Sequence, residues 1–520
     1  MKLFVLPLRL SLLVLLSLSC LSGAAQVKLN YKASFKEPEK HYVEVELHCE
    51  QLETAETSFI LPVWSPGYYQ ILNTPKNIVD FSVKNEAGQD LGWFKQSKNS
   101  WVIKNEAEKS IIISYRYFAN DKSVAESMVD DTKAFVMPGN MFMHIKDQIQ
   151  LPVNLSISPF KSWSSISTGL KQTDAKLHTY YAENFDVLYD SPIYIGNQKV
   201  ISFQHENKSY TMGLATPEGL DEKTFVADVK TIISTTTELM GHVPYENYCF
   251  IMMEQGGGGL EHLNSQAVFT NGDFLFSSGK SYTDFMNFIT HEYFHLYNVK
   301  AIRPIELGPF DYSKENYTEM LWVSEGLTVY YEYLIMLRAG LLDGVEALKY
   351  LGESMASYEN YEGKNHMSLS RSSFDIWLNF FNRDENAKDV TISYYNKGPV
   401  MGLLLDLEIR QLTANKKSLD DVMRYLYNTY YLQEKRGFKK EEFWQACQEI
   451  AGQPLTELQH YVDTVAVIDY NKYLAYAGLE LEIETDLEAT EDSGKNSYNL
   501  VPVKGANKQQ LQIRKSLFQF

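Results

Sequence analysis

Cysteine and positive charge are both scarce in this chain, and each scarcity excludes a class of protein. The 520 residues include only four cysteines. Cys49, Cys249 and Cys447 lie far apart, and Cys20 lies in an N-terminal segment that we expect to be removed. An odd number of distant cysteines argues against a disulfide framework, so the fold must depend on its hydrophobic core. The formal net charge of −18 argues against nucleic acid or an anionic membrane as a partner.

Nucleophile and phosphate-binding motifs are also absent. The sequence contains no Gly-x-Ser-x-Gly elbow, no cysteine in a recognisable nucleophile motif and no Gly-x-Gly-x-x-Gly fingerprint after a strand. A glycine run does occur at Gly256–Gly259, but it lacks the lysine and the serine or threonine of a phosphate-binding loop. The sequence therefore gives no support to a serine or cysteine hydrolase or to a nucleotide-binding enzyme.

The apolar run at the N-terminus is too short to span a membrane. A basic start precedes an apolar core at Leu10–Leu18, and small residues follow up to Ala25. A membrane-spanning helix needs about 20 apolar residues, whereas this arrangement is typical of a cleavable signal peptide over residues 1–25. A lipid anchor at Cys20 is the alternative, but the residues before it fit a lipid-attachment signal poorly. We therefore expect cleavage after Ala25 and a periplasmic or secreted protein.

A His-Glu-x-x-His motif spans His291–His295 within an apolar sequence. Histidines at i and i+4 lie about 40° apart around a helix and one turn apart along it, so both imidazoles can face one metal ion. Glu292 is rotated by roughly 100° from the first histidine, which suits a general base rather than a ligand. A Ser281-x-x-Asp284 capping box predicts the start of this helix. Chance occurrence, or a pair of core histidines, is the alternative explanation.

A catalytic zinc takes three protein ligands and a water, so a third ligand is expected on another element. Glu325 is the best candidate, because apolar residues flank it on both sides and a carboxylate in such surroundings needs a partner. Glu332 is the nearest other acid, but it follows a tyrosine pair nearer the far end of the helix. An ordinary glutamate on a helix surface is the alternative for Glu325.

The segments His291–Pro304 and Leu321–Gly326 together resemble the glycyl aminopeptidase family of zinc metallopeptidases. These enzymes are gluzincins, a group that includes aminopeptidase N and the thermolysin-like enzymes and whose zinc ligands are two histidines and a glutamate. The resemblance implies a Zn²⁺ cofactor held by His291, His295 and Glu325, a thermolysin-like catalytic domain and a peptide substrate.

The same resemblance gives the glycine run a role. In this family and in aminopeptidase N, a similar segment forms an edge against which the peptide lies, and its glutamate receives the free amine of the substrate. Here the edge would include Gly258 and Gly259, and the glutamate would be Glu261. A charge-assisted bond to an ammonium group would select N-terminal residues over internal ones. A flexible glycine turn followed by an exposed Glu261-His262 pair is the alternative.

A candidate catalytic tyrosine follows from a second similarity. The segment Tyr394–Pro399 is similar to the Tyr-x-Lys-Gly segment that carries a catalytic tyrosine in the aminopeptidase N group. Aligned in that way the residue is Tyr395, and Tyr394 is the near competitor. A phenol near the metal can donate a hydrogen bond to the oxyanion of a tetrahedral intermediate. The implied mechanism is metal-assisted hydrolysis, in which zinc polarises a water and the scissile carbonyl while Glu292 moves the proton.

The chain divides into a β-rich part and a helical part, which predicts an α+β protein of several domains. Short alternating runs such as Tyr42–Leu47 predict a sandwich-like domain over residues 26–200. Helical patterns such as Glu222–Met240 and Gly398–Leu412 predict a mainly helical, thermolysin-like catalytic domain over residues 201–475.

Two other segments bear on the resemblance. Val63–Tyr69 resembles part of the family's N-terminal domain, but its proline and glycine more often mark a turn than a site, so we assign it no catalytic role. Many relatives continue into a PDZ domain, and residues 476–520 are too few to complete one. Their richness in charge and in Asn, Gln and Ser predicts an incomplete PDZ domain or a partly disordered extension.

Two functions from different classes remain. The first is a zinc aminopeptidase that removes small N-terminal residues, glycine or alanine by family resemblance, in the periplasm or outside the cell. The second is a secreted peptide-binding protein whose metal site is silent. Glu292 and Tyr395 favour the enzyme, since neither is needed merely to hold zinc. An endopeptidase on the same site would differ only in whether Glu261 closes the cleft to longer chains. The sequence indicates no particular oligomeric state.

Overall fold

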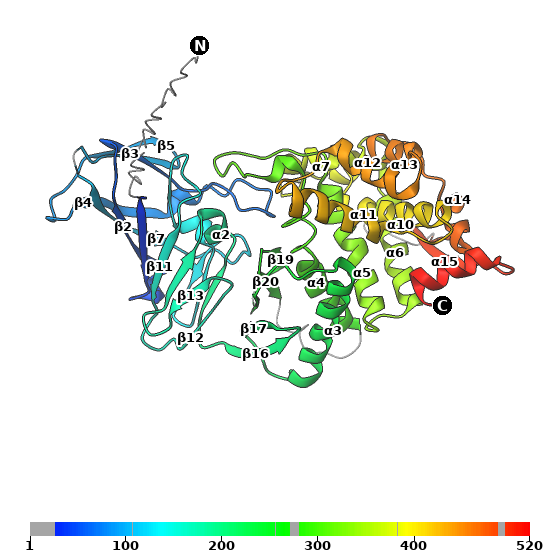
Figure 1. Ribbon diagram of the computed structural model, residues 1–520, viewed down its shortest axis with the longest axis horizontal. Helices are drawn as coiled ribbons and strands as arrows, with labels where there is room; N and C mark the ends of the chain where they lie inside the picture. Colours follow the sequence, from blue (N-terminus) through cyan, green and yellow to red (C-terminus); the bar gives the residue numbers. More distant parts are fainter. Residues whose placement is uncertain (1–25, 107, 255, 271–279, 382, 487–494) are drawn as a thin grey trace, which may run out of the picture.

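The computed structural model describes residues 26–106, 108–254, 256–270, 280–381, 383–486 and 495–520 (Figure 1). A β-rich N-terminal part, drawn in blue and cyan, lies at one end of the molecule, and a helical lobe, drawn in light green to red, lies at the other. A small sheet and helices α3 (Glu222–Met240) and α4 (Lys280–Phe294) lie between them. The predicted α+β class, with sheets followed by helices, is confirmed. The predicted signal peptide, which includes Cys20, lies outside the described residues.

Three sheets form the N-terminal part. Their strand orders are β13-β14-β11-β1-β2-β7-β4, β10-β3-β6-β5 and β12-β15-β9-β8. Alternate residues are buried along β2 and β7, as expected for strands with one face on a core. The strands are β1 Lys28–Ser34, β2 Tyr42–Glu50, β3 Glu56–Ile60, β4 Ile78–Asn85, β5 Trp93–Ser97, β6 Ser100–Lys104, β7 Ser110–Phe118, β8 Met128–Val129, β9 Ala134–Val136, β10 His144–Ile145, β11 Val153–Ser158, β12 Ser165–Thr168, β13 Lys171–Asp174, β14 Thr179–Ala182 and β15 Ile193–Gly196. Two short helices, α1 Pro138–Met141 and α2 Phe185–Tyr189, accompany them.

A five-stranded sheet of order β16-β17-β18-β20-β19 follows the N-terminal part. Strands β17, β18 and β20 run parallel, and β19 pairs antiparallel with β20 at the end of the sheet. The strands are β16 Lys199–His205, β17 Lys208–Leu214, β18 Asn247–Glu254, β19 Gly258–Glu261 and β20 Ser265–Thr270. The predicted glycine edge therefore forms an end strand of the sheet, and Glu261 is its last residue.

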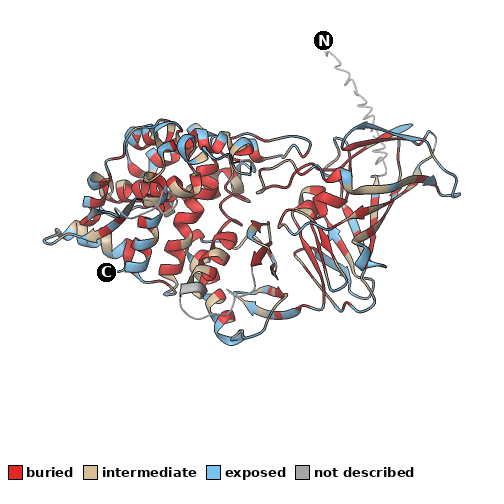
Figure 2. Cartoon of the chain, turned by 180° about the vertical axis from the view of Figure 1, so that it is seen from behind, coloured by how far each residue is buried: buried red, intermediate tan, exposed pale blue. Residues whose placement is uncertain are grey.

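The helical lobe is built around two buried helices. Nearly every residue of α5 and most residues of α10 are buried, and Figure 2 shows this concentration of buried residues in red. The other helices pack around this pair. Their bounds are α5 Leu327–Arg338, α6 Gly344–Glu359, α7 Leu369–Phe374, α8 Ile376–Asn379, α9 Ala387–Val390, α10 Tyr394–Leu412, α11 Leu419–Leu426, α12 Lys440–Ala451, α13 Thr456–Asp463 and α14 Tyr470–Leu474. None of the helices within the described ranges is long and apolar enough to cross a membrane.

Helix α3 has the predicted bounds, whereas α10 begins four residues earlier than the sequence pattern indicated. Ser393 caps the helix, because its hydroxyl accepts a hydrogen bond from the Tyr395 backbone N–H at 3.2 Å. The early start places Tyr394 and Tyr395 on the first turn of α10 rather than in a loop.

The described residues of the C-terminal segment form secondary structure that docks on the helical lobe. Strands β21 (Leu479–Thr485) and β22 (Asn496–Pro502) pair with each other, and helix α15 (Lys508–Phe518) follows. Helix α15 buries Ile513, Leu517 and Phe518.

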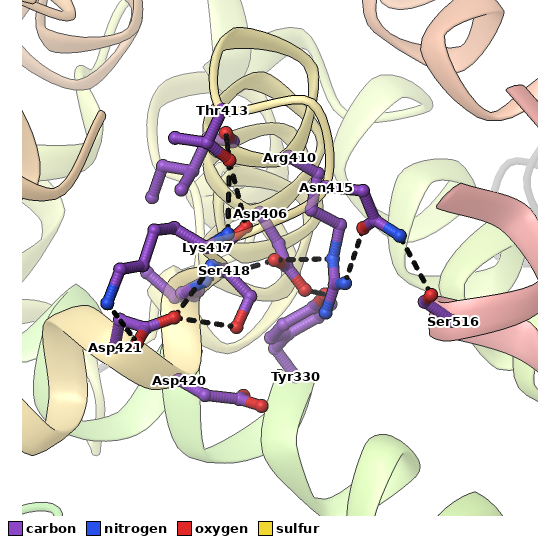
Figure 3. Close-up of polar contacts among 12 residues, drawn as sticks. Tyr330, Asp406, Arg410, Thr413, Asn415, Lys417, Ser418, Asp420, Asp421 and Ser516 are labelled. Atoms are coloured by element: carbon purple, nitrogen blue, oxygen red, sulfur yellow. Dashed lines mark hydrogen bonds and ion pairs between the residues drawn. The ribbon is translucent and has the colours of Figure 1, made fainter. Parts of the chain in front are cut away.

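A polar network fixes this C-terminal helix to the lobe (Figure 3). Asn415 donates to the Ser516 hydroxyl at 2.9 Å and accepts from Arg410 at 3.0 Å. Arg410 in turn donates to the buried carboxylate of Asp406 at 2.9 Å, which also accepts from the Tyr330 hydroxyl at 2.8 Å. Because every group in this chain of contacts has a partner, the buried charge is compensated.

Candidate active site

The two histidines of the motif lie at the end of α4. His291 is in the last turn of the helix, and His295 follows directly after it. A hydrogen bond from the His295 N–H to the His291 carbonyl at 3.3 Å continues the helical turn. The helix begins at Lys280, so the predicted cap, Ser281, lies one residue inside it.

The two imidazole rings point their Nε2 atoms at one another. These atoms are 3.0 Å apart, and the rings are nearly perpendicular, at 86°. The other ring nitrogen of each histidine has an acceptor: His291 Nδ1 lies 2.7 Å from a carboxylate oxygen of Glu332, and His295 Nδ1 lies 2.7 Å from the carbonyl oxygen of Asn298. These acceptors place the protons on Nδ1, which leaves both Nε2 lone pairs directed at the same point.

Glu325 completes the group from a different element. It lies on a π-helical turn, η4 (Trp322–Gly326), directly before α5, and its side chain is 3% exposed. Its Oε2 is 3.3 Å from His295 Nε2 and 3.7 Å from His291 Nε2. Burial alone would raise the pKa of Glu325, but the electrostatic attraction of His295 and His291 outweighs it and holds the pKa well below its usual range.

The spacing of these three groups fits a zinc ion. Ligands about 2.0–2.1 Å from a tetrahedral zinc lie about 3.3 Å from each other, and the observed separations are 3.0, 3.3 and 3.7 Å. Two neutral imidazoles and one carboxylate are a common donor set of catalytic zinc sites. The predicted ligands His291, His295 and Glu325 are therefore brought together as one candidate metal group.

Glu292 lies beside this group and is 4% exposed. Its carboxylate packs against Gly259 so closely that a Cβ at that position would collide with it. Burial raises the pKa of Glu292 to about 7, although the neighbouring His291 and His295 act in the opposite direction. A carboxyl group with a pKa near neutrality can both accept and donate a proton, as a general base requires.

Glu261 is also close to this group. Its carboxylate, that of Glu292 and a ring nitrogen of His295 lie within 4.8 Å of one another. It is 4% exposed and 3.8 Å from the Lys300 ammonium group, which is also paired with Asp190 at 2.8 Å. The alternative of an exposed Glu-His pair is wrong, because the sheet carries both residues into the interior.

The two tyrosines at the start of α10 differ in exposure. Tyr395 is half-buried and lines the same cavity as His291. The ring centroids of these two residues are 6.4 Å apart. Tyr394 is 1% exposed, and its hydroxyl has no hydrogen-bond partner among the described residues. Tyr395 therefore has the more accessible phenol of the pair.

His291, Glu292, Tyr394 and Tyr395 line a cavity of about 590 Å³, to which both the N-terminal part and the helical lobe contribute. Its lining residues are Gly67, Tyr68, Tyr69, Lys122, Ser123, Val124, Gly257, Gly258, Gly259, Asp284, Asn287, Phe288, His291, Glu292, Glu332, Tyr333, Tyr350, Phe380, Phe381, Tyr394 and Tyr395. The rings of Tyr68 and Phe381 lie 4.5 Å apart and connect the N-terminal part to the helical lobe. A second cavity of about 1090 Å³ adjoins it and shares Phe380 and Tyr394.

The segment Val63–Tyr69 thus reaches the active site, although sequence reasoning assigned it no catalytic role. Gly67 has a φ of +86°, and a Cβ there would lie 2.7 Å from Glu261 Oε1. Both the left-handed backbone and the close approach require glycine. The resemblance to the family's N-terminal domain was the available signal, but it does not show which turn of that domain faces the metal group.

Glu332 and Asn298 are functional residues that sequence reasoning missed. Glu332 was considered only as a rival of Glu325, yet its carboxylate orients His291 from outside the metal group. Asn298 orients His295 through its carbonyl, and its side chain donates to the Val323 carbonyl at 2.7 Å, close to Glu325. Acceptors of this kind are expected for any metal-binding histidine, but their sequence positions depend on the fold.

Comparisons with known proteins agree with this geometry. The model of the peptidase M61 N-terminal domain matches residues 30–197, and that of the M61 glycyl aminopeptidase matches residues 284–401. Together they match more than half of the chain. The comparison with curated protein sequences gave no match.

Solved structures share the fold. An aminopeptidase N family protein from Idiomarina loihiensis is similar with a TM-score of 0.84 and 26% identity, over 89% of this chain and 80% of that chain. An M1 zinc metallopeptidase from Deinococcus radiodurans has a TM-score of 0.51 and 11% identity, over 85% of this chain and 96% of that chain. Aminopeptidase A from Legionella pneumophila has a TM-score of 0.52 and 12% identity, over 92% of this chain and 52% of that chain.

The histidine and glutamate group lies within the matched catalytic region, and the N-terminal match includes the turn at Gly67 that lines the cavity. The chain therefore belongs to the M61 glycyl aminopeptidase family and is a zinc-dependent aminopeptidase of the M61/M1 metallopeptidase type.

Proposed function

We propose that this enzyme is exported and removes small N-terminal residues, glycine or alanine, from peptides. The observation that carries the proposal is the position of Glu261, within 4.8 Å of the Glu292 carboxylate and a His295 ring nitrogen. A carboxylate so close to the reacting groups can hold the ammonium group of a substrate next to the scissile bond. An internal peptide segment has no such charge, so the arrangement favours N-terminal residues.

The limited space near Glu261 supports a substrate whose N-terminal residue has a small side chain. A Cβ on Gly67 would lie 2.7 Å both from Glu261 Oε1 and from the Leu260 side chain. A Cβ on Gly259 would likewise collide with the Glu292 carboxylate. These close approaches narrow the room available to a residue held through its amine. Glycine and alanine need the least room.

The roles of the other residues follow from their positions. His291, His295 and Glu325 would hold the zinc, which when bound acts as a Lewis acid that polarises a carbonyl and lowers the pKa of water. Glu292 takes the proton of the attacking water and passes one to the leaving amine, and its pKa of about 7 suits both transfers. Tyr395 donates a hydrogen bond to the developing oxyanion.

A solved relative supports peptides as the substrate class. A mutant of the M1 zinc metallopeptidase from Deinococcus radiodurans is described as bound to a Tyr-Ser-Ala substrate. The aromatic and glycine lining of the cavity here, with the end strand β19 beside it, is compatible with an extended peptide.

The N-terminal sequence supports export. Its basic start, short apolar core and small residues up to Ala25 are those of a secretory signal peptide. Mass spectrometry of the protein recovered from periplasmic or culture fractions tests this part of the proposal. A mature chain that begins at Gln26 is expected, whereas a full-length chain confined to the cytosol would contradict it.

Hydrolysis of aminoacyl p-nitroanilides by the zinc-loaded protein tests the specificity. The expected order of kcat/KM is glycyl and alanyl above leucyl, with no cleavage of the N-acetylated compounds. Glu261→Gln keeps the size of the side chain but removes its charge, so it should lower kcat/KM for free-amine substrates. Cleavage of N-acetylated peptides would identify an endopeptidase instead, and zinc binding without any hydrolysis would identify a peptide-binding protein.

A further inference from the structure

Asn287 lines the active-site cavity but has no part in the mechanism above. It lies on α4 one turn before His291, so the two side chains share a face of the helix. It is 4% exposed, and it lines the cavity together with Gly258, Glu292 and Glu332. Its place on the helix that carries the histidines puts it within one helical turn of the reacting groups.

Both polar atoms of the Asn287 side chain, Oδ1 and Nδ2, are buried without a hydrogen-bond partner among the described residues. A carboxamide can donate two hydrogen bonds and accept two. The polar groups on the same cavity wall are engaged elsewhere: Glu332 accepts from His291 at 2.7 Å, and Asp284 accepts from the Tyr350 hydroxyl at 2.5 Å. Buried polar groups in folded proteins are nearly always paired, and because Asn287 lines the cavity, the cavity is the side from which a partner can reach it.

The order of groups along α4 indicates which part of a peptide substrate would contact Asn287. Asn287, His291 and His295 follow one another at steps of four residues, about 6 Å each. Glu261 is grouped with His295 and Glu292, toward the C-terminal end of the helix. If Glu261 holds the substrate amine, the chain beyond the scissile bond extends in the opposite direction, toward Asn287.

We propose that the Asn287 carboxamide binds a main-chain amide of the peptide on the leaving-group side of the scissile bond, donating to its carbonyl and accepting from an N–H. The inference rests on the proposed aminopeptidase function. It assigns Asn287 as a residue that selects peptides of three or more residues over aminoacyl amides, because only the longer substrates have a main-chain amide at that position.

Kinetics on two alanyl substrates test the proposal. Ala-Ala-Ala has a second peptide bond beyond the scissile one, and alanyl p-nitroanilide has none. For Asn287→Leu, which has a similar size without polar atoms, the ratio of kcat/KM for the tripeptide to that for the anilide should fall about 10-fold, the effect of losing one or two hydrogen bonds. A ratio equal to that of the wild type would overturn the proposal.

Thermal unfolding separates this role from a structural one. Asn287→Leu should leave Tm unchanged or raise it, because the carboxamide has no partner within the described residues. Asn99→Leu is a matched control that should lower Tm, since Asn99 is buried and donates to the Leu61 carbonyl at 3.0 Å. A fall in Tm for Asn287→Leu as large as that of the control would overturn the proposal.

A measurement of peptide binding tests the role of Asn287 independently of catalysis. If the wild type cleaves neither substrate, the proposed function fails, and calorimetry then tests Asn287 alone. The zinc-loaded Glu292→Gln protein should bind Ala-Ala-Ala about 10-fold more tightly than the Glu292→Gln, Asn287→Leu protein. Equal affinities would overturn the inference, whatever the activity of the wild type.

Discussion

Gly326 and Gly398 lie backbone against backbone where the π-helical turn η4 meets α10. A Cβ on either glycine would lie 2.5 Å from the Cα of the other. Glu325 directly precedes Gly326, and Tyr395 lies one turn before Gly398. Gly326 has an ordinary helical φ of −66°, so this position requires space rather than a special conformation. The contact packs the turn that carries the third metal ligand, Glu325, directly against the helix that carries the catalytic tyrosine candidate, Tyr395.

We therefore expect Gly398→Ala to lower the free energy of unfolding by about 1 to 3 kcal/mol, because the added methyl group meets backbone atoms that cannot rotate away. Chemical denaturation of the purified protein measures the change. Gly257→Ala is the control, since a Cβ at Gly257 meets nothing within 4 Å. Equal stability of the two variants would show that the glycine contact tolerates a side chain.

Glu332 orients His291, so its removal should weaken zinc binding. Glu332→Ala is expected to lower zinc affinity about 10- to 100-fold, because His291 loses the acceptor that fixes its ring and tautomer. Competition with a chromophoric chelator measures the affinity. Glu332→Gln keeps an acceptor oxygen, so its zinc affinity should fall less. Glu353→Ala removes a half-exposed carboxylate of α6 and should leave the zinc affinity unchanged. Wild-type affinity in Glu332→Ala would contradict the orienting role.

The two tyrosines of α10 should differ in their effect on turnover. Tyr395→Phe removes the accessible phenol and is expected to lower kcat about 10²- to 10³-fold with little change in KM, as for the loss of one oxyanion donor. Tyr394→Phe should lower kcat far less, because its hydroxyl is buried. Steady-state kinetics on alanyl p-nitroanilide compares the two variants. A larger loss in Tyr394→Phe would transfer the role to that residue.

His144 should make the protein less stable in acid. Burial lowers the pKa of His144 to about 4, although Asp147 acts in the opposite direction, whereas an unfolded histidine has a pKa of about 6.5. Between these values the unfolded chain takes up a proton that the folded protein does not. The free energy of unfolding should therefore fall as pH decreases from about 6.5 to about 4, by about 3 kcal/mol in total.

Urea denaturation at pH 7 and at pH 4.5 checks this expectation. His144→Gln should reduce the difference between the two pH values, because it removes the buried titrating group. His48→Gln is the control, since His48 is exposed and its ring contacts Glu46 on the same strand, β2. An unaltered pH dependence in His144→Gln would assign the acid sensitivity to other groups.

Local patterns predicted much of the fold and the metal group. The bounds of α3 follow from its periodicity and from Asp221 at its start, whose side chain accepts from the Thr224 N–H. The spacing within His291–His295 likewise follows from helix geometry alone. The apolar residues around Glu325 indicated it as the third ligand, and the family resemblance supported that choice, but the π-helical turn on which it lies has no distinctive sequence pattern.

Long-range contacts could not be predicted in the same way. Gly67 reaches Glu261 from another part of the chain, and its sequence context indicates only a turn. The unpaired carboxamide of Asn287 becomes visible only when the neighbours of the side chain are known. Periodicity places such residues on a face of an element, but the packing of elements decides what that face meets.

Zinc-dependent proton transfer by Glu292 is the central claim, and one comparison tests it most directly. Hydrolysis of glycyl p-nitroanilide is measured for the wild type, for the wild type stripped by a chelator and for Glu292→Gln, with the zinc content of each sample determined. We expect Glu292→Gln to retain its zinc but to lose about 10²- to 10⁴-fold in kcat, and the stripped protein to be inactive until zinc is restored. Wild-type turnover by fully zinc-loaded Glu292→Gln, or by the stripped protein, would contradict the account.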